Sequence, residues 1–121
     1  MYLFVIILNK PEKLMKVLDV MKKNGSKGAT VIDSIGAGEI MKKQEEDLPM
    51  IASIKRLKEE GFYTNKTILS VVEDIKTLQK IAQAIEDEVG NFSDKTMGIM
   101  FSMPLNMVRG GKIGRFDRVF E

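Results

Sequence analysis

Cysteine and histidine are both absent from this chain of 121 residues. The missing cysteines exclude disulfides, thiolate catalysis and zinc sites built from cysteine. The missing histidines remove the commonest general base, the Ser-His and Cys-His catalytic pairs and the commonest metal ligand. An enzyme made from the remaining residues would depend on carboxylates, lysines or a cofactor.

The chain also lacks a large excess of positive or negative charge, and it lacks long apolar runs. The chain has 19 Lys and Arg against 17 Asp and Glu, a formal net charge of +2, so electrostatics gives no reason to expect nucleic acid as a partner. The apolar run Tyr2 to Leu8 is too short to cross a bilayer, and we expect no membrane insertion. The length fits a single domain, residues 1–121.

The patterns that are present predict a strand, helix, strand, long loop, strand, helix, strand order. The first helix opens at Pro11 and the second follows Asp74 as its N-cap. Their apolar stripes have helical spacing: Leu14, Val17, Leu18 and Met21, then Leu78, Ile81, Ala82 and Ile85. The expected strands are Tyr2 to Leu8, Thr30 to Ile35, Lys66 to Glu73 and Thr96 to Met103. This order predicts an α+β fold, the ferredoxin-like βαβ-βαβ sandwich, with the two most apolar strands, the first and third, at its centre.

The stretch from Gly28 to Gly38 carries the main functional signal. Glycines at the end of a strand let the backbone approach a ligand closely, although an ordinary strand with a flexible exit has the same pattern. The connection that follows, Glu39 to Thr64, is longer than this fold requires, and Asp47 to Gly61 predicts a short helix within it. We therefore expect a ligand site with a signalling loop attached.

The C-terminal tail, residues 110–121, alternates basic and aromatic side chains at Arg115, Phe116, Arg118 and Phe120. Such alternation occurs in nucleic-acid-binding segments, but a short strand that pairs with its own or a neighbouring subunit is favoured here.

Several of these segments resemble the PII nitrogen-regulatory signalling proteins and their PII-like relatives. They are the apolar first strand, N-G-S-K-G-A-T after the first helix, G-A-G at the end of the second strand, T-I-L-S-V-V-E, and M-G-I-M-F-S-M-P-L-N-M-V-R-G. The resemblance extends to about Gly111. It implies a cytoplasmic homotrimer, not an enzyme, that binds nucleotides in clefts between subunits. The long loop, residues 39–64, would be the T-loop that regulates a target protein, such as an enzyme, transporter or regulator of nitrogen or carbon metabolism.

The resemblance also implies ligand-binding residues. It places Thr30 near the base of the nucleotide, and the backbone of Gly36, Ala37 and Gly38 beside the nucleotide. Gly98 falls at the last glycine before the fourth strand. The cations expected to face these glycines across a subunit boundary are Lys66, Lys95 and Arg109. No catalytic or metal-binding residue is expected.

The chain departs from the family pattern where polyphosphates would bind. The family carries a glycine-rich loop ending in Gly-Asp-Gly-Lys, whereas this chain has G-N-F-S-D-K-T-M-G-I, with Ile99 in place of the lysine. Glu39 also stands where typical members have a basic residue. No cofactor is therefore required by the sequence, and AMP, ADP or an adenine second messenger is expected to bind at least as well as ATP.

Two alternatives remain open. One is a trimeric relative of the divalent-cation-tolerance type, to which the lack of histidine and cysteine is an objection. The other is a small carboxylate enzyme, for which Asp33 has no paired acid at a recognisable spacing.

Overall fold

The computed structural model describes residues 1–37 and 64–119. Its helical elements are the 3-10 turn η1 (Pro11–Lys13) and the α-helices α1 (Leu14–Lys23) and α4 (Ile75–Glu88). Its strands are β1 (Tyr2–Leu8), β2 (Thr30–Ile35), β3 (Thr64–Val72), β4 (Gly98–Pro104), β5 (Met107–Gly110) and β6 (Gly114–Asp117). The predicted helix Asp47 to Gly61 and most of the predicted long loop lie outside the described residues.

The four long strands form one antiparallel sheet in the order β2-β3-β1-β4. Strands β1 and β3 lie at its centre, as predicted, so the predicted ferredoxin-like α+β fold is confirmed. Leu8 is opposite Lys66 on one side and Gly98 on the other, and Ile35 is opposite Thr64. We call this end of the sheet, where β1 and β2 finish and β3 and β4 begin, the loop end, because residues 38–63 connect β2 to β3 there.

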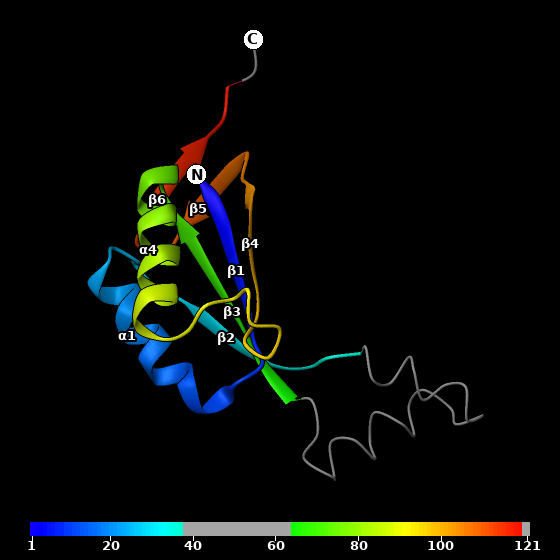
Figure 1. The fold of residues 1–121 in the computed structure, drawn as a ribbon. Helices are drawn as coiled ribbons and strands as arrows, with labels where there is room; N and C mark the ends of the chain where they lie inside the picture. Colours follow the sequence, from blue (N-terminus) through cyan, green and yellow to red (C-terminus); the bar gives the residue numbers. More distant parts are fainter. Residues whose placement is uncertain (38–63, 120–121) are drawn as a thin grey trace, which may run out of the picture.

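Both α-helices cover the same face of the sheet (Figure 1). Phe4, Ile6 and Leu8 point from β1 into the layer between sheet and helices and are buried. The stripes predicted from helical spacing pack there too, with Val17 and Met21 from α1 and Ile81 and Ile85 from α4 in the core. This layer is the hydrophobic core of the domain.

Several element ends differ from the predictions by one to three residues. Pro11 begins the 3-10 turn η1, not the α-helix itself, and no side chain caps that turn. Strand β3 begins at Thr64 because Thr64 still pairs with Ile35, so the predicted loop 39–64 ends one residue inside the strand. The predicted cap of α4 is confirmed, since Asp74 accepts a hydrogen bond of 2.8 Å from the Thr77 backbone N–H.

The C-terminal tail forms a hairpin with its own chain. Strand β6 pairs with β5, from Met107 opposite Asp117 to Gly110 opposite Gly114. The favoured interpretation of the tail as a short pairing strand is confirmed. The hairpin lies near the N-terminus, at the end of the sheet opposite the loop end (Figure 1). We call this end of the sheet the hairpin end.

The second face of the sheet is apolar as well. Its side chains form cross-strand rows, such as Thr30, Leu69, Val5 and Phe101. Exposed large apolar side chains on this face include Ile32, Ile99, Phe101 and Met103. In the described part of the chain both α-helices lie on the opposite face, so this surface is open to a partner.

Candidate functional site

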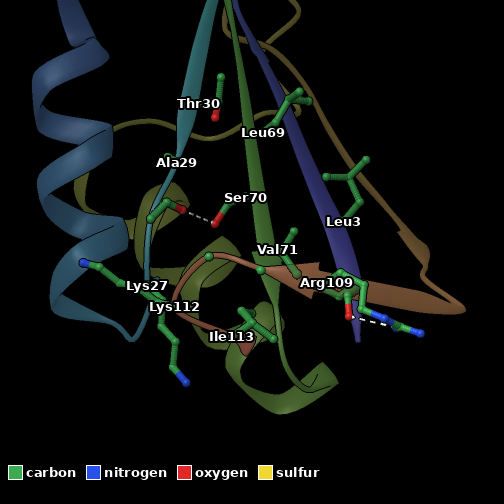
Figure 2. Close-up of a pocket in the computed structure, with 14 residues that line it drawn as sticks. Leu3, Lys27, Ala29, Thr30, Leu69, Ser70, Val71, Arg109, Lys112 and Ile113 are labelled. Carbon is green, nitrogen blue, oxygen red and sulfur yellow. Dashed lines mark hydrogen bonds between the residues drawn. The ribbon is translucent and has the colours of Figure 1, made fainter. Parts of the chain in front are cut away.

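A cleft of about 620 Å³ opens at the hairpin end, between the start of β2 and the β5–β6 hairpin (Figure 2). Apolar side chains of the sheet, Leu3, Leu69 and Val71, contribute to its wall. Polar and cationic side chains surround them: Thr30, Ser70, Lys27, Arg109 and Lys112. An apolar wall with a few polar groups, at this volume, is the usual composition of a small-molecule site.

The wall formed by residues 28–30 is fixed by a buried hydroxyl. Ser70 is 3 % exposed, donates a hydrogen bond of 2.6 Å to the carbonyl of Gly28, and lies 3.0 Å from the hydroxyl of Ser26. Figure 2 shows this bond between β3 and the segment that precedes β2. Ser70 was not among the predicted site residues. The sequence feature that could have identified it is a serine between Ile68 and Val72, at a position whose side chain faces the helices, where an apolar residue is expected.

Arg109 is held along the hairpin by several groups. Its Nη2 atom lies 2.8 Å from Oδ1 of Asp117, and its Nη1 atom donates to the carbonyls of Val108 and Phe116 at 3.3 and 3.4 Å. A guanidinium with several fixed donors loses little further freedom when an anion binds it. Within one chain, the structure brings Arg109 and Thr30, both predicted site residues, to the same cleft.

The other predicted residues lie at or near the loop end. Gly36 and Ala37 follow β2, and Gly38 lies outside the described residues. Lys66 forms an ion pair with Asp33 across the β2–β3 pair. These two side chains help line a second, smaller pocket of about 300 Å³.

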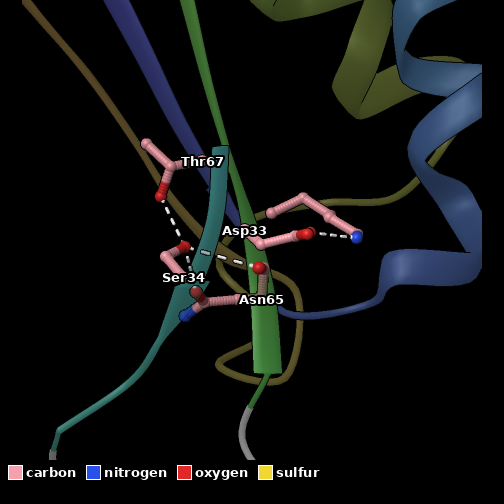
Figure 3. Close-up of polar contacts among 5 residues, drawn as sticks. Asp33, Ser34, Asn65 and Thr67 are labelled. Atoms are coloured by element: carbon pink, nitrogen blue, oxygen red, sulfur yellow. Dashed lines mark hydrogen bonds and ion pairs between the residues drawn. The ribbon is translucent and has the colours of Figure 1, made fainter. Parts of the chain in front are cut away.

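On the other side of the same two strands lies a hydroxyl and amide cluster (Figure 3). Ser34 donates to the side-chain oxygen of Asn65 and lies 2.7 Å from the hydroxyl of Thr67. Asn65 is buried and donates onward to the side-chain oxygen of Asn9 at 3.3 Å. These bonds fix the strand ends to which residues 38–63 connect.

Gly98 has a packing reason for being glycine. Its φ is +121°, and a Cβ built on it would lie 1.9 Å from the carbonyl oxygen of Ile7. Lys95, three residues earlier, is exposed in the turn between α4 and β4. The ligand roles of Gly36, Ala37, Gly38, Lys66, Lys95 and Gly98 stay predictions. Among the described residues, Lys66 and Gly98 pair with the last residue of β1, at the end of the sheet opposite the hairpin that carries Arg109.

The turn between α4 and β4 uses its backbone N–H groups internally. Those of Phe92, Ser93 and Thr96 donate to the side chains of Glu86, Asn91 and Asp94 at 2.8 to 3.1 Å. Those of Asp94 and Met97 donate to backbone carbonyls at 3.2 and 3.0 Å. A phosphate cradle needs free N–H groups, and in this turn these five are already engaged.

Asp94 adds negative charge to the same turn. Hydrogen bonds from the backbone and hydroxyl of Thr96 hold the pKa of Asp94 below its ordinary value of 3.8, so the carboxylate is ionised at neutral pH. The turn thus carries one fixed negative charge next to the positive charge of Lys95.

The comparison with protein families gives one match, to the family described as nitrogen regulatory protein P-II, over residues 1–113. The chain belongs to the P-II family. The PII resemblance inferred from the sequence is thus confirmed, and it extends from the first strand through the turn of the β5–β6 hairpin. P-II proteins are trimeric regulatory proteins that interact with target proteins. A comparison with curated protein sequences gives no significant match.

Two further findings concern the described residues of this P-II protein. None of their helices is both long and apolar enough to span a membrane. Nor do three or more acidic side chains gather there in the manner of a metal site.

Proposed function

We propose that this P-II protein is a cytoplasmic, non-catalytic regulator that binds an adenine nucleotide or similar small metabolite and acts on a target protein through residues 39–64. The observation that carries the proposal is the cleft at the hairpin end, which joins Thr30 and Arg109. A threonine hydroxyl suits the polar edge of a base, the apolar wall suits its ring, and a guanidinium suits a phosphate.

The preferred ligand carries few phosphates. Position 99, the second residue of β4, is isoleucine and not lysine. Five N–H groups of the turn before β4 are engaged internally. AMP, ADP or an adenine second messenger should therefore bind at least as well as ATP.

We propose that a homotrimer completes the site. The open face carries Ile32, Ile99, Phe101 and Met103, and burying such a face between subunits removes apolar area from water at about 25 cal/mol per Å². In this arrangement the loop end of one subunit lies against the hairpin end of the next. Gly36, Ala37, Gly38, Lys66, Lys95 and Gly98 would then face the cleft that contains Thr30 and Arg109.

Calorimetric titration with AMP, ADP and ATP tests the proposal. We expect ADP to bind at least as tightly as ATP, and Arg109→Ala to weaken ADP about tenfold or more, which corresponds to about 1.4 kcal/mol. The matched control is Lys16→Ala, which removes one positive charge from an exposed position of α1. It should bind ADP as the unmodified protein does.

Two results would contradict the proposal. ATP binding much tighter than ADP would show that a polyphosphate site exists in spite of the occupied turn. Unchanged ADP affinity in Arg109→Ala would show that the phosphates do not bind at the hairpin end.

A further inference from the structure

The C-terminal hairpin places two arginines directly opposite each other. Gly110, Gly111 and Gly114 have φ values of 96°, 62° and 85°, which glycine adopts readily, and this tight reversal returns β6 along β5. The resulting register pairs Arg109 with Arg115. Opposed residues of antiparallel strands project from the same face, and two like charges there destabilise the pair.

A carboxylate of the same hairpin lies between these arginines. Oδ1 of Asp117 is 2.8 Å from Nη2 of Arg109, and Oδ2 of Asp117 is 3.3 Å from Nε of Arg115. One small anion thus bridges both guanidiniums. Because the two oxygens of a carboxylate reach both arginines, two oxygens of a phosphate can bridge them in the same way.

The bridging carboxylate is open to exchange. The side chains of Arg109, Arg115 and Asp117 are 42 %, 72 % and 47 % exposed. Ion pairs this accessible to water contribute little net free energy, so their rupture costs little. Two positive charges against one negative charge also leave the cluster cationic, which favours an anion of higher charge.

The cluster is connected to the cleft through Arg109, which lines the cleft together with Thr30. We propose that Arg115 and Arg109 form a clamp for a phosphate group of the ligand, and that Asp117 occupies this clamp until the phosphate displaces it. The inference rests on the proposed function in requiring a phosphate-bearing ligand. It adds Arg115 as a binding residue and makes Asp117 a built-in competitor that sets the ligand's threshold concentration.

Calorimetry at one fixed salt concentration tests the clamp with three probes: ADP, adenosine and inorganic pyrophosphate. Arg115→Ala should weaken ADP and pyrophosphate about tenfold and leave adenosine unchanged, because adenosine has no phosphate. Asp117→Asn should tighten ADP and pyrophosphate about threefold, because it removes the competing charge. Arg118→Ala, which removes the same charge one residue beyond Asp117, serves as the control and should change either affinity less than about threefold.

The outcomes separate the clamp from the proposed function. If ADP binds and Arg115→Ala leaves its affinity unchanged, the clamp is overturned and the nucleotide function stands. If pyrophosphate binding depends on Arg115 but neither ADP nor adenosine binds, the nucleotide function fails and the clamp stands. If Asp117→Asn bound ADP and pyrophosphate more weakly, the proposal that the phosphate displaces Asp117 would be overturned, since Asp117 would then help to position the arginines. If neither ADP nor pyrophosphate binds the unmodified protein, both proposals fail.

Discussion

Replacing Gly98 with alanine should destabilise the protein strongly, although it adds only one methyl group. The new Cβ would lie 1.9 Å from the carbonyl oxygen of Ile7 and 3.2 Å from the backbone nitrogen of Asn9. Contacts under 3.0 Å are essentially never seen for Cβ atoms, so β4 would have to move by more than an ångström relative to β1.

The cost of Gly98→Ala has two parts. An alanine held at φ +121° is strained by about 1–3 kcal/mol. Moving the start of β4 also disturbs the pairing of Gly98 with Leu8 and of Ile99 with Ile7, at about 1 kcal/mol for each weakened hydrogen bond. Together we expect a loss of about 3 kcal/mol or more, a large share of the roughly 5–15 kcal/mol that stabilises a typical domain.

Urea denaturation at one fixed protein concentration measures this loss, since the stability of an oligomer depends on concentration. Gly28→Ala is the matched control, because its Cβ would have no heavy atom within 4 Å and its φ is not positive. It should change the free energy of unfolding by less than about 0.5 kcal/mol. Equal midpoints for the two variants would refute the packing argument. If Gly98→Ala were as stable as the control but had lost ADP binding, the glycine would serve the ligand, as the sequence predicts.

Three further predictions concern the caps and the long loop. Hydrogen bonds from the backbone and hydroxyl of Thr77 hold the pKa of Asp74 below its ordinary value of 3.8. The stability that this cap contributes is therefore fully present above the pKa of Asp74 in the unfolded chain. It is lost as pH falls through the lower pKa of the folded protein. Urea curves of Asp74→Ala and the unmodified protein should therefore differ most at neutral pH and converge in acid; a gap that widens in acid would contradict this. Lys13→Met removes the 3.1 Å hydrogen bond from Nζ to the carbonyl of Val89 at the end of α4, and should cost about 1 kcal/mol in urea denaturation, whereas Lys16→Met, on the exposed side of α1, should cost almost nothing. Replacing residues 39–63 with a short turn should leave a folded trimer by light scattering, since each doubling of loop length changes the closure free energy by only about 0.6 kcal/mol, while target binding is lost. An unfolded or monomeric product would show that the segment belongs to the core or to the subunit interface.

The sequence predicts most of the fold because local patterns and tertiary packing agree. Strand β1 and the Ile68–Val72 half of β3 are mainly apolar, as befits central strands whose two faces can both be covered, and both strands lie at the centre of the sheet. Asp74 caps α4 through a hydrogen bond to Thr77, only three residues later in the chain, and sequence spacing alone can specify so local a contact. Element ends are less predictable, since Thr64 belongs to β3 only through its pairing with Ile35.

The candidate site is less predictable, because it depends on register and on distant contacts. Thr30 and Arg109 meet in one cleft only after the sheet and the hairpin have formed. Arg115 becomes the partner of Arg109 through the turn that contains Gly110 and Gly114, and a shift of one residue would separate them. No periodicity in the sequence carries this information.

The same limit applies to the other site residues. Ser70 acts through the carbonyl of Gly28, which is 42 residues away in the chain. The separation of Gly36, Lys66 and Gly98 from Arg109 follows from strand order and direction, which local patterns do not specify. To predict a site shared between subunits, one must also know how the three chains are arranged.

The most direct test of the central claim is to map chemical-shift changes on the isotopically labelled protein during titration with ADP. The account predicts that the largest changes occur at the hairpin end, at Thr30, at Leu69 to Val71 and at Val108 to Gly110, with further changes at the loop end if the trimer joins the two. Changes confined to the loop end, at Gly36, Ala37, Lys66 and Lys95, or no changes at saturating ADP, would contradict it.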